Sequence, residues 1–591
     1  MFYKILIIWT CLLCLSEANI DLPLNDTNEF ILSYEQGTVR GRIDIDVDGK
    51  SFYSFQGMPY AKPPVGDLRF KEPEPFEKWD KHEIWDGTKE GSKCPQKLLD
   101  GTIEGDENCL FVNVYTRYIE KDFKGTKNVL VWFHGGSFVE GSGNTDIHGP
   151  KYIVSEDIVL VTFNYRLGAL GFLTIDDPQF NISGNAGIKD QLLVLRWVRK
   201  YIHNFGGDAT RVTIGGNSAG GISADLHMLS TYSNNKEKLF NRVISQSAPL
   251  MLFEVTWPKP GWARDLAVLM QFDPTNNSTA DLYDHLKSQD VGQLLDAQTI
   301  LSGVQNTKNF IRPCLEPETA KNRIISDLPI NIIKENKFRQ VPYLKGFVDQ
   351  EAMFVLLYIA MNPNLVPKDA KDVEAYLPKD MGLEPGTDKS LEYATKVYKR
   401  YFHENENQIQ NYLNLVGDTS FVYPINRQAL EMAKVMGRNS LFYYLFTLDT
   451  ELNLFKRQLN ITDYKGAAHT DEKGYLFNFD GSPKIVQGSD LYKYIKRMLK
   501  LWTNFAKYGD PNGANATRVD GVYWPSVTKT ELNYLKIDKE LTRGIAPFSD
   551  MIKFWDELYE SLRSKGFFPQ SNPLFCFITV SVFVVSVFYS A

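Results

Sequence analysis

Short, continuous apolar runs alternate with helical patterns through most of the chain. Six short runs are predicted to be buried strands: 129–134, 158–164, 211–216, 241–247, 341–348 and 440–448. The runs 129–134 and 158–164 are apolar at nearly every position, which is typical of strands buried on both faces. Apolar residues every three or four positions predict helices at 186–206, 218–230 and 491–509. Buried strands separated by helices predict an α/β fold with a large, mostly parallel central sheet flanked by helices.

Two segments are less regular. The stretch 52–75 is rich in turn-forming residues and is interpreted as irregular structure. The stretch 251–342 is mostly helical in pattern and is interpreted as an insertion over one edge of the sheet. The chain contains no internal repeat, low-complexity run or linker rich in Pro, Gly or Ser. Residues 19–566 are therefore predicted to form a single domain.

Both ends of the chain are apolar. Residues 1–18 carry Lys4, an apolar run and then small residues, which predicts a secretory signal peptide rather than a buried strand or an anchor helix. The last 18 residues, 574–591, carry no charge. Together with the signal peptide, the tail 567–591 is typical of a glycosylphosphatidylinositol attachment signal; a membrane span and a buried element are the alternatives. We therefore expect an extracellular protein anchored at the cell surface.

Composition and charge exclude some classes of function. With 43% hydrophobic and 23% charged residues, the 591-residue chain has the composition of a globular protein. Its 65 Lys and Arg against 72 Asp and Glu give a net charge of −7, which supplies no basic field for a nucleic acid. Six N-x-[ST] sequons fit the secretory pathway and predict glycosylation at Asn25, Asn181, Asn276, Asn277, Asn460 and Asn515.

Gly216-Asn217-Ser218-Ala219-Gly220 is the strongest chemical motif. This G-x-S-x-G sequence lies between a predicted strand and a predicted helix. A serine at such a sharp turn adopts a strained backbone that exposes its hydroxyl, and only small neighbours fit around it. We interpret Ser218 as a nucleophile; the alternative is an ordinary glycine-rich turn.

A serine nucleophile needs a base, and the chain has eight histidines. His203 and His227 fall in predicted helices, and His134 directly precedes a Gly-Gly pair that it is expected to support. His469 lies in a Gly- and Ala-flanked loop that follows a predicted strand, where α/β folds display catalytic groups. We predict His469 as the base; the alternative is a surface-loop histidine.

The base in turn needs a carboxylate, which α/β-hydrolases place between the serine and the histidine in the chain. Glu351 and Asp349 both follow the predicted strand 341–348, and the residues alone leave both candidates open. The segment His134-Gly135-Gly136-Ser137-Phe138 ends a predicted strand in the manner of an oxyanion loop. Its backbone N–H groups and that of Ala219 would form the oxyanion hole; the alternative is a plain glycine turn.

Long motifs throughout the chain resemble those of one family. FQGMPYAKPPVGDLRF, DENCLFVNVY, FHGGSFVEGSG, NYRLGALGFL, GNAGIKDQLLVLRWV, DQEAMF and GAAHTDEKGYLF are similar to segments of the type-B carboxylesterases, the cholinesterase-like esterases. The resemblance implies an α/β-hydrolase fold whose helical insertions form a gorge. It also implies that Ser218, Glu351 and His469 form a catalytic triad. The oxyanion hole of the family falls on Gly136, Ser137 and Ala219, and its first disulfide falls on Cys94 and Cys109. Cys314 is then left as a buried, inert thiol.

Three departures from the family pattern change the expected specificity. Asn217 stands where the family usually has Glu, which removes a negative charge beside the triad. Ser137 replaces the third glycine of the oxyanion loop but keeps its N–H. The segment 94–109 contains no aromatic residue, so the cation–π contact that cholinesterases make to choline there is absent. The missing ring argues against an acetylcholinesterase.

The expected function is therefore hydrolysis of apolar, small-molecule carboxylic esters through an acyl-enzyme, without metal or cofactor. The alternative is an inactive adhesion or binding protein at the cell surface, since the family includes members that have lost triad residues. The complete triad in this chain favours the enzyme.

Overall fold

The computed structural model describes residues 28–564 except 81, 99, 120–125, 176, 231, 233–235, 252–260, 305–311, 321, 403–406, 438–439 and 516–517. The predicted signal peptide, Asn25 and the C-terminal tail lie outside these residues and stay predictions. Among the described helices, none combines the length and the apolar character needed to cross a bilayer.

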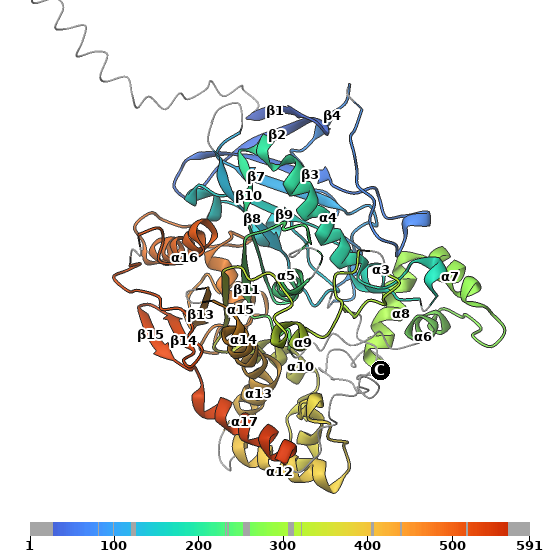
Figure 1. Cartoon of the computed structure of the whole chain (residues 1–591), viewed down its shortest axis with the longest axis vertical. Helices are drawn as coiled ribbons and strands as arrows, with labels where there is room; N and C mark the ends of the chain where they lie inside the picture. Colours follow the sequence, from blue (N-terminus) through green and yellow to red (C-terminus); the bar gives the residue numbers. More distant parts are fainter. Residues whose placement is uncertain are drawn as a thin grey trace, which may run out of the picture.

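One sheet of thirteen strands runs through the described chain (Figure 1), and a separate pair, β5 and β6, forms a small ribbon. The strands are β1 Glu29–Tyr34, β2 Gly37–Ile45, β3 Ser51–Pro59, β4 Ile84–Asp86, β5 Gln96–Lys97, β6 Ile103–Glu104, β7 Phe111–Thr116, β8 Lys127–Phe133, β9 Val159–Phe163, β10 Gly207–Asn217, β11 Arg242–Gln246, β12 Tyr343–Val348, β13 Leu441–Phe446, β14 Asn533–Ile537 and β15 Leu541–Ile545.

The middle of the large sheet is parallel and its ends are antiparallel. The order is β1-β2-β3-β7-β9-β8-β10-β11-β12-β13-β14-β15, with β4 added beside β2. Every neighbouring pair from β9 to β14 is parallel. The pairs from β1 to β9 and the pair β14–β15 are antiparallel. The predicted mostly parallel α/β fold is confirmed.

Helices connect and cover these strands (Figure 1). They are α2 Thr145–His148, α3 Gly168–Phe172, α4 Ala186–Tyr201, α5 Ala219–Leu229, α6 Trp262–Leu269, α7 Thr279–Ser288, α8 Val291–Val304, α9 Pro329–Lys334, α10 Val355–Met361, α11 Ala370–Val373, α12 Asp388–Tyr401, α13 Gln408–Gly417, α14 Tyr423–Val435, α15 Leu454–Gln458, α16 Asp490–Tyr508 and α17 Ser549–Ser564.

Both faces of the central sheet are buried, as the continuous apolar strands predict. Along β8, Val131 packs into one core with residues of α4 and α5, while its neighbour Trp132 packs into a second core with residues of α16. Successive side chains of a strand point to opposite faces, so this alternation places helices on both sides of the sheet. Figure 1 shows α16 across the strands from α4.

The prediction of irregular structure over 52–75 is wrong for its first part, because β3 occupies Ser51–Pro59. The strand has a register irregularity between Phe55 and Met58, and the buried Gln56 donates a hydrogen bond to Tyr115 Oη at 3.2 Å. Ser, Gln, Gly and Pro within the strand conceal it in the sequence, because Ser, Gly and Pro are more frequent in turns.

Among its described residues, the segment 251–342 contains α6, α7, α8 and α9, joined by non-helical stretches such as 312–320. Its helices α6, α7 and α8 form a group beside α3 (Figure 1). α8 packs against α3, α6 and β5, so the group contacts α3 and the small ribbon.

Candidate functional site

Ser218 occupies a sharp turn between β10 and α5. It follows the last residue of the strand and precedes the first residue of the helix, with φ 57° and ψ −125°. A positive φ is strained for a residue with a side chain and persists only where the surroundings enforce it. Here the Ser218 N–H donates to the Gln246 carbonyl at 2.9 Å, which ties the turn to the end of β11. The Ser218 side chain is half-buried.

The two glycines of the G-x-S-x-G motif are needed for close packing around this turn. A Cβ on Gly216 would lie 2.4 Å from the carbonyl carbon of Gly220. A Cβ on Gly220 would lie 2.0 Å from the Phe133 carbonyl oxygen at the end of β8. The start of α5 therefore rests directly on backbone, and no larger residue fits without displacing the turn.

Glu351 and His469 form a buried pair. Glu351 begins a 3₁₀ turn three residues after β12, and its Oε1 accepts a hydrogen bond from Val348 N at 3.0 Å. Its Oε2 lies 2.5 Å from His469 Nδ1. Glu351 is 1% exposed and His469 is 8% exposed. With Nδ1–H donating to the carboxylate, the Nε2 atom is the acceptor, which is the tautomer that a general base requires.

Asp349, the competing carboxylate, has a different task. Its Oδ1 accepts a hydrogen bond from Ala467 N at 2.8 Å, and Gln350 N donates to the Ala467 carbonyl at 3.1 Å. These bonds attach the His469 loop to the end of β12. Burial raises the pKa of Asp349 to about 6. Within the described structure, the carboxylate that contacts His469 is Glu351 and not Asp349.

The loop that carries His469 is held from its other side as well. The buried Asp471 accepts hydrogen bonds from Ala468 N at 2.7 Å and from Phe455 N at 2.9 Å. Burial raises the pKa of Asp471 to about 7. The Phe421 ring lies 4.7 Å from the imidazole of His469, centroid to centroid, and restricts its orientation.

The predicted oxyanion loop packs against the turn that carries Ser218. A Cβ on Gly135 would lie 2.7 Å from the Asn217 carbonyl oxygen and 3.3 Å from Ser218 Cβ. Gly136 and Ser137 have φ 110° and φ 54°. The N–H groups of Gly136, Ser137 and Ala219 make no hydrogen bond to any described residue, and Ala219 is the first residue of α5. The first N–H groups of a helix have no partner within it and suit a developing negative charge.

His134 and His227 are not placed as bases. The His134 ring stacks on Tyr165 with centroids 4.2 Å apart, and its Nδ1 lies 2.8 Å from the Gly135 carbonyl. Burial lowers the pKa of His134 to about 4 and that of His227 to about 3. His227 contacts the side chain of Gln191 instead. Both rings are neutral packing groups, as the sequence suggested.

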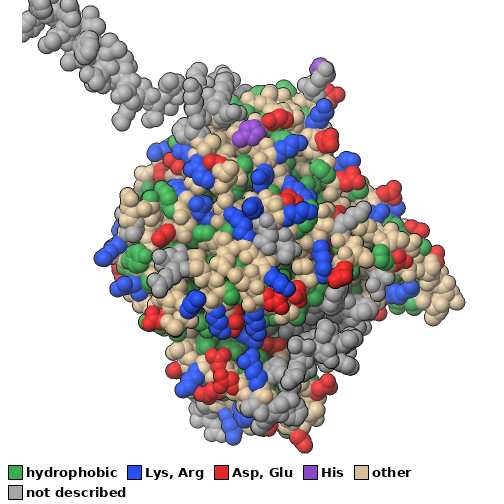
Figure 2. Space-filling view, in the orientation of Figure 1, with side chains coloured by type: hydrophobic (Ala, Val, Ile, Leu, Met, Phe, Trp, Pro, Cys, Tyr) green, Lys and Arg blue, Asp and Glu red, His purple; other side chains and the backbone are tan. Residues whose placement is uncertain are grey.

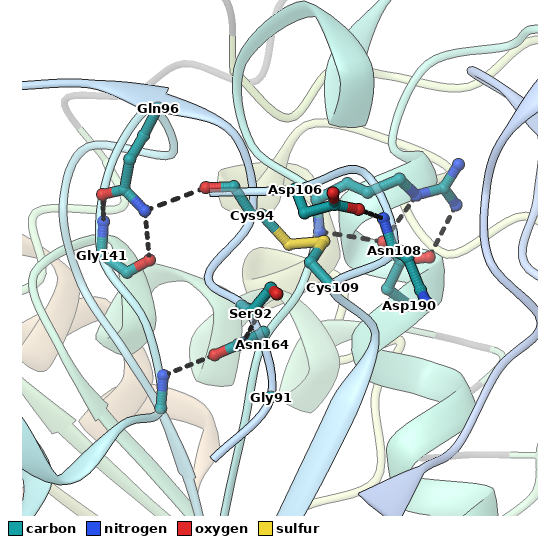
Figure 3. The surroundings of a disulfide bond; sticks show 12 residues. Gly91, Ser92, Cys94, Gln96, Asp106, Asn108, Cys109, Gly141, Asn164 and Asp190 are labelled. Carbon is teal, nitrogen blue, oxygen red and sulfur yellow. Dashed lines mark hydrogen bonds and ion pairs between the residues drawn. A yellow bond between two sulfur atoms is a disulfide. The ribbon is translucent and has the colours of Figure 1, made fainter. Parts of the chain in front are cut away.

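The disulfide between Cys94 and Cys109 is present, and Figure 3 shows its surroundings. Gln96, two residues after Cys94, exchanges two hydrogen bonds with Gly141: Gly141 N donates to its Oε1 at 2.7 Å, and its Nε2 donates to the Gly141 carbonyl at 3.2 Å. Asn164 also joins the two segments, because it accepts from Gly143 N and donates to the Ser92 carbonyl. The disulfide loop thus braces the chain that leaves the oxyanion loop.

Cys314 is a buried free thiol, as predicted, and burial raises its pKa.

The sequons with described side chains lie at the surface: Asn181, Asn276, Asn460 and Asn515 are exposed and Asn277 is partly exposed. Glycosylation of these residues stays a prediction. On the face shown in Figure 2, basic and acidic side chains are interspersed.

Sequence reasoning missed one further carboxyl group at the site. Glu472 is fully buried three residues after His469, and its Oε1 accepts hydrogen bonds from Asn217 Nδ2 at 3.2 Å and Tyr444 Oη at 3.1 Å. The run of charged residues in HTDEKG, between apolar segments, was the available indication.

The described residues hold no group of three or more His, Cys, Asp or Glu side chains placed to bind a metal.

A cavity of about 310 Å³ borders the carboxylate of the pair. Glu351, Asp349, Arg400, Asn414 and Asp418 are among its lining residues, and burial raises the pKa of Asp418 to about 7. Ser218 and His469 are not among the lining residues.

Comparison with known proteins assigns the family. The family model described as "Carboxylesterase family" matches residues 28–555. Esterase B1 of Culex pipiens is 30% identical over 88% of this chain and 97% of its own length. Juvenile hormone esterase of Tribolium castaneum is 31% identical, covering 88% and 92% of the two chains. The crystal structure of juvenile hormone esterase from Manduca sexta superposes with a TM-score of 0.78 at 28% identity, covering 90% of this chain and all of that one. The chain therefore belongs to the carboxylesterase family, the α/β-hydrolases that the sequence motifs resemble, and it is a serine hydrolase of the carboxylesterase type.

Proposed function

We propose that this protein hydrolyses apolar, small-molecule carboxylic esters through a Ser218–His469–Glu351 triad and an acyl-enzyme intermediate. Ser218 Oγ attacks the ester carbonyl carbon while His469 Nε2 takes the hydroxyl proton. The N–H groups of Gly136, Ser137 and Ala219 stabilise the negative charge on the carbonyl oxygen. When the tetrahedral intermediate collapses, the alcohol leaves with the proton from His469. A water molecule deprotonated by His469 then attacks the acyl group, and the acid is released as Ser218 recovers its proton.

The contact between Glu351 Oε2 and His469 Nδ1, at 2.5 Å, is the observation that carries this proposal. It orients the imidazole and stabilises the imidazolium that forms during attack. The strained turn at Ser218 supports the same assignment, because strain of this kind is typical of a nucleophile displayed at a strand–helix junction. The proposal needs no metal and no cofactor.

Apolar esters are favoured by what surrounds the pair and by what the chain lacks. The rings of Phe354 and Phe421 lie 6.1 and 4.7 Å from the imidazole of His469. Asn217 replaces a charged residue beside the serine, and the segment 94–109 offers no ring to a cationic alcohol. Two of the relatives are named for juvenile hormone, and the Manduca sexta structure carries OTFP covalently attached. For this chain we therefore propose apolar esters as the class of substrate, and not one particular hormone.

We also propose that the enzyme is secreted and held at the cell surface, on the strength of the predicted signal peptide and uncharged tail. Release of active enzyme from expressing cells by a phospholipase specific for glycosylphosphatidylinositol tests the anchor. Enzyme released by detergent alone would contradict it.

Ester turnover by the purified ectodomain tests the catalytic assignment. p-Nitrophenyl esters of increasing acyl length are compared for the native protein and for Ser218→Ala. The variant is expected to lose turnover by at least about 10⁴-fold, because the nucleophile is gone. Ser288→Ala removes an exposed hydroxyl at the end of α7 and is the control, which should keep native turnover. Equal turnover by Ser218→Ala and the native protein would end the assignment.

A further inference from the structure

Glu472 joins four parts of the site that are distant in the chain. Its Oε1 accepts from Asn217 Nδ2 at the end of β10 and from Tyr444 Oη on β13. Ser247 Oγ, directly after β11, lies 3.5 Å away. Glu472 itself is three residues beyond His469, in the same loop. One fully buried carboxyl group therefore links the turn that carries the nucleophile to the loop that carries the base.

Two polar atoms of this cluster have no partner among the described residues. They are Glu472 Oε2 and Asn217 Oδ1, the remaining polar atoms of two side chains that already share one hydrogen bond. Both atoms are acceptors if Glu472 is ionised, so they cannot satisfy each other. A buried acceptor without a donor is costly, and native structures avoid this. A single proton on Glu472 Oε2 would satisfy both atoms at once.

The charged groups around Glu472 point the same way. Burial raises the pKa of Glu472, and the nearby Glu351 raises it further, while His469 and the Gln246 amide lower it. The Gln246 Nε2 atom makes no hydrogen bond of ordinary geometry to a described residue. Lys473 is the neighbouring cation; burial lowers its pKa to about 8. No ion pair between Lys473 and Glu472 occurs in the described structure.

We propose that Glu472 is a neutral carboxylic acid in the resting enzyme and pairs with the Asn217 amide to position His469 against Ser218. In this pair Glu472 Oε2–H donates to Asn217 Oδ1, and Asn217 Nδ2 donates to Glu472 Oε1. Glu472 is a positioning residue, since it acts through the nucleophile turn and the base loop and not on the substrate. The catalytic part of this inference rests on the proposed function.

The proposal explains why Asn at position 217 is compatible with catalysis. An ionised Glu472 would place a second anion near His469, in addition to Glu351, and would hold the imidazole in its charged form at higher pH. A neutral acid paired with a neutral amide adds rigidity without adding charge. Asn217 can both donate to and accept from a carboxylic acid, which a carboxylate at this position could do only by sharing a proton.

Asn217→Asp distinguishes a neutral from an ionised Glu472. If Glu472 is neutral, the substitution gives the pair one negative charge, because two adjacent carboxyl groups share one proton. The acid limb of the kcat/KM profile should then move about one pH unit upward, since the new charge favours the imidazolium. If Glu472 is ionised already, the variant pair takes up a proton, its net charge is unchanged and the limb stays where it is, which would overturn the proposal. Asn217→Leu, which adds no charge, is the matched control and should not move the limb.

Substitution of Glu472 separates positioning from bulk stability. Glu472→Gln keeps a neutral group that can pair with the amide, so kcat should stay within about threefold of native. Glu472→Ala removes the link and should lower kcat about 10- to 100-fold with little change in KM, as expected when catalytic groups are misplaced. Equal loss of kcat in both variants would contradict a neutral acid.

A measurement without turnover keeps this inference separate from the proposed function. A carboxyl group whose pKa is raised in the folded state stabilises the fold only at low pH, and that contribution is lost as the pH rises through the folded pKa. The Tm of Glu472→Gln relative to native should therefore increase as the pH rises above about 4.3, the pKa of the unfolded side chain. A Tm difference that does not change with pH would overturn the proposal even if Ser218 proves catalytic.

Discussion

Glu351→Gln tests the acid–base pair most specifically, because the structure dictates how the new amide must sit. Glu351 Oε1 accepts from Val348 N at 3.0 Å, so the carbonyl oxygen of Gln is required at that position. The amide nitrogen then faces His469 Nδ1, where Oε2 now lies at 2.5 Å. Two donors cannot bond to each other. The imidazole must therefore move its proton to Nε2, which removes the acceptor that Ser218 needs.

The expected loss is large for an isosteric change. The same acid-to-amide substitution in the serine protease triad lowers kcat about 10⁴-fold through the wrong tautomer. At about 1.36 kcal/mol per factor of ten, this corresponds to about 5.5 kcal/mol of transition-state stabilisation. KM should change little, because Glu351 is buried behind the imidazole and 1% exposed.

Steady-state hydrolysis of a p-nitrophenyl ester measures the loss, with both proteins normalised by active-site titration. Asp349→Asn is the matched control: it is the same acid-to-amide change two residues away, and Asn can still accept from Ala467 N. The control should keep kcat within about threefold of native. A Glu351→Gln enzyme within about tenfold of native, or an Asp349→Asn enzyme that loses as much, would refute the assignment of the triad carboxylate.

Three further predictions concern the framework of the site. Burial raises the pKa of Asp349 to about 6, so its charge opposes folding at neutral pH. The free energy of unfolding in urea of Asp349→Asn, relative to native, should therefore rise by up to about 3 kcal/mol from about pH 4 to about pH 6 and then level off. A difference that stays constant with pH would contradict the raised pKa. The double variant Cys94→Ser/Cys109→Ser opens a loop closed by two cysteines 15 residues apart. Its free energy of unfolding in urea should be about 3 kcal/mol lower than that of the native protein. An unchanged urea midpoint would show that the disulfide does not stabilise the fold. Gly220→Ala places a Cβ 2.0 Å from the carbonyl oxygen at the end of β8 and should lower the free energy of unfolding by about 3 kcal/mol in the same assay. Gly437→Ala is the control, because its added Cβ meets nothing within 4 Å, and it should change the stability little.

The parts of the fold that can be predicted from the sequence are those in which one residue pattern reports one environment. β8, β9 and β13 are apolar almost throughout because helices cover both faces, so their positions can be recognised. β1 and β2 alternate between more and less exposed residues, and β3 contains Gly and Pro. β1, β2 and β3 follow one another in the chain and pair antiparallel, and their mixture of exposed and buried positions leaves no continuous apolar run to recognise.

The same contrast holds for the site. Ser218 is indicated by Gly216 and Gly220, because close backbone packing admits no larger residue there. The choice between Glu351 and Asp349 depends on which carboxylate the turn after β12 directs at His469, which is a three-dimensional property. Glu472 was missed for the same reason: its partners come from β10 and β13, and nothing near it in the chain identifies them.

Covalent labelling of the native protein is the most direct test of the central claim, that Ser218 is the group acylated by the substrate. The protein is treated with a fluorophosphonate, digested, and the modified residue is identified by tandem mass spectrometry. We expect modification at Ser218 alone, slowed by an excess of an ester substrate and slowed at least about 10³-fold in His469→Ala. Modification of another residue, or equal labelling of Ser218→Ala, would contradict it.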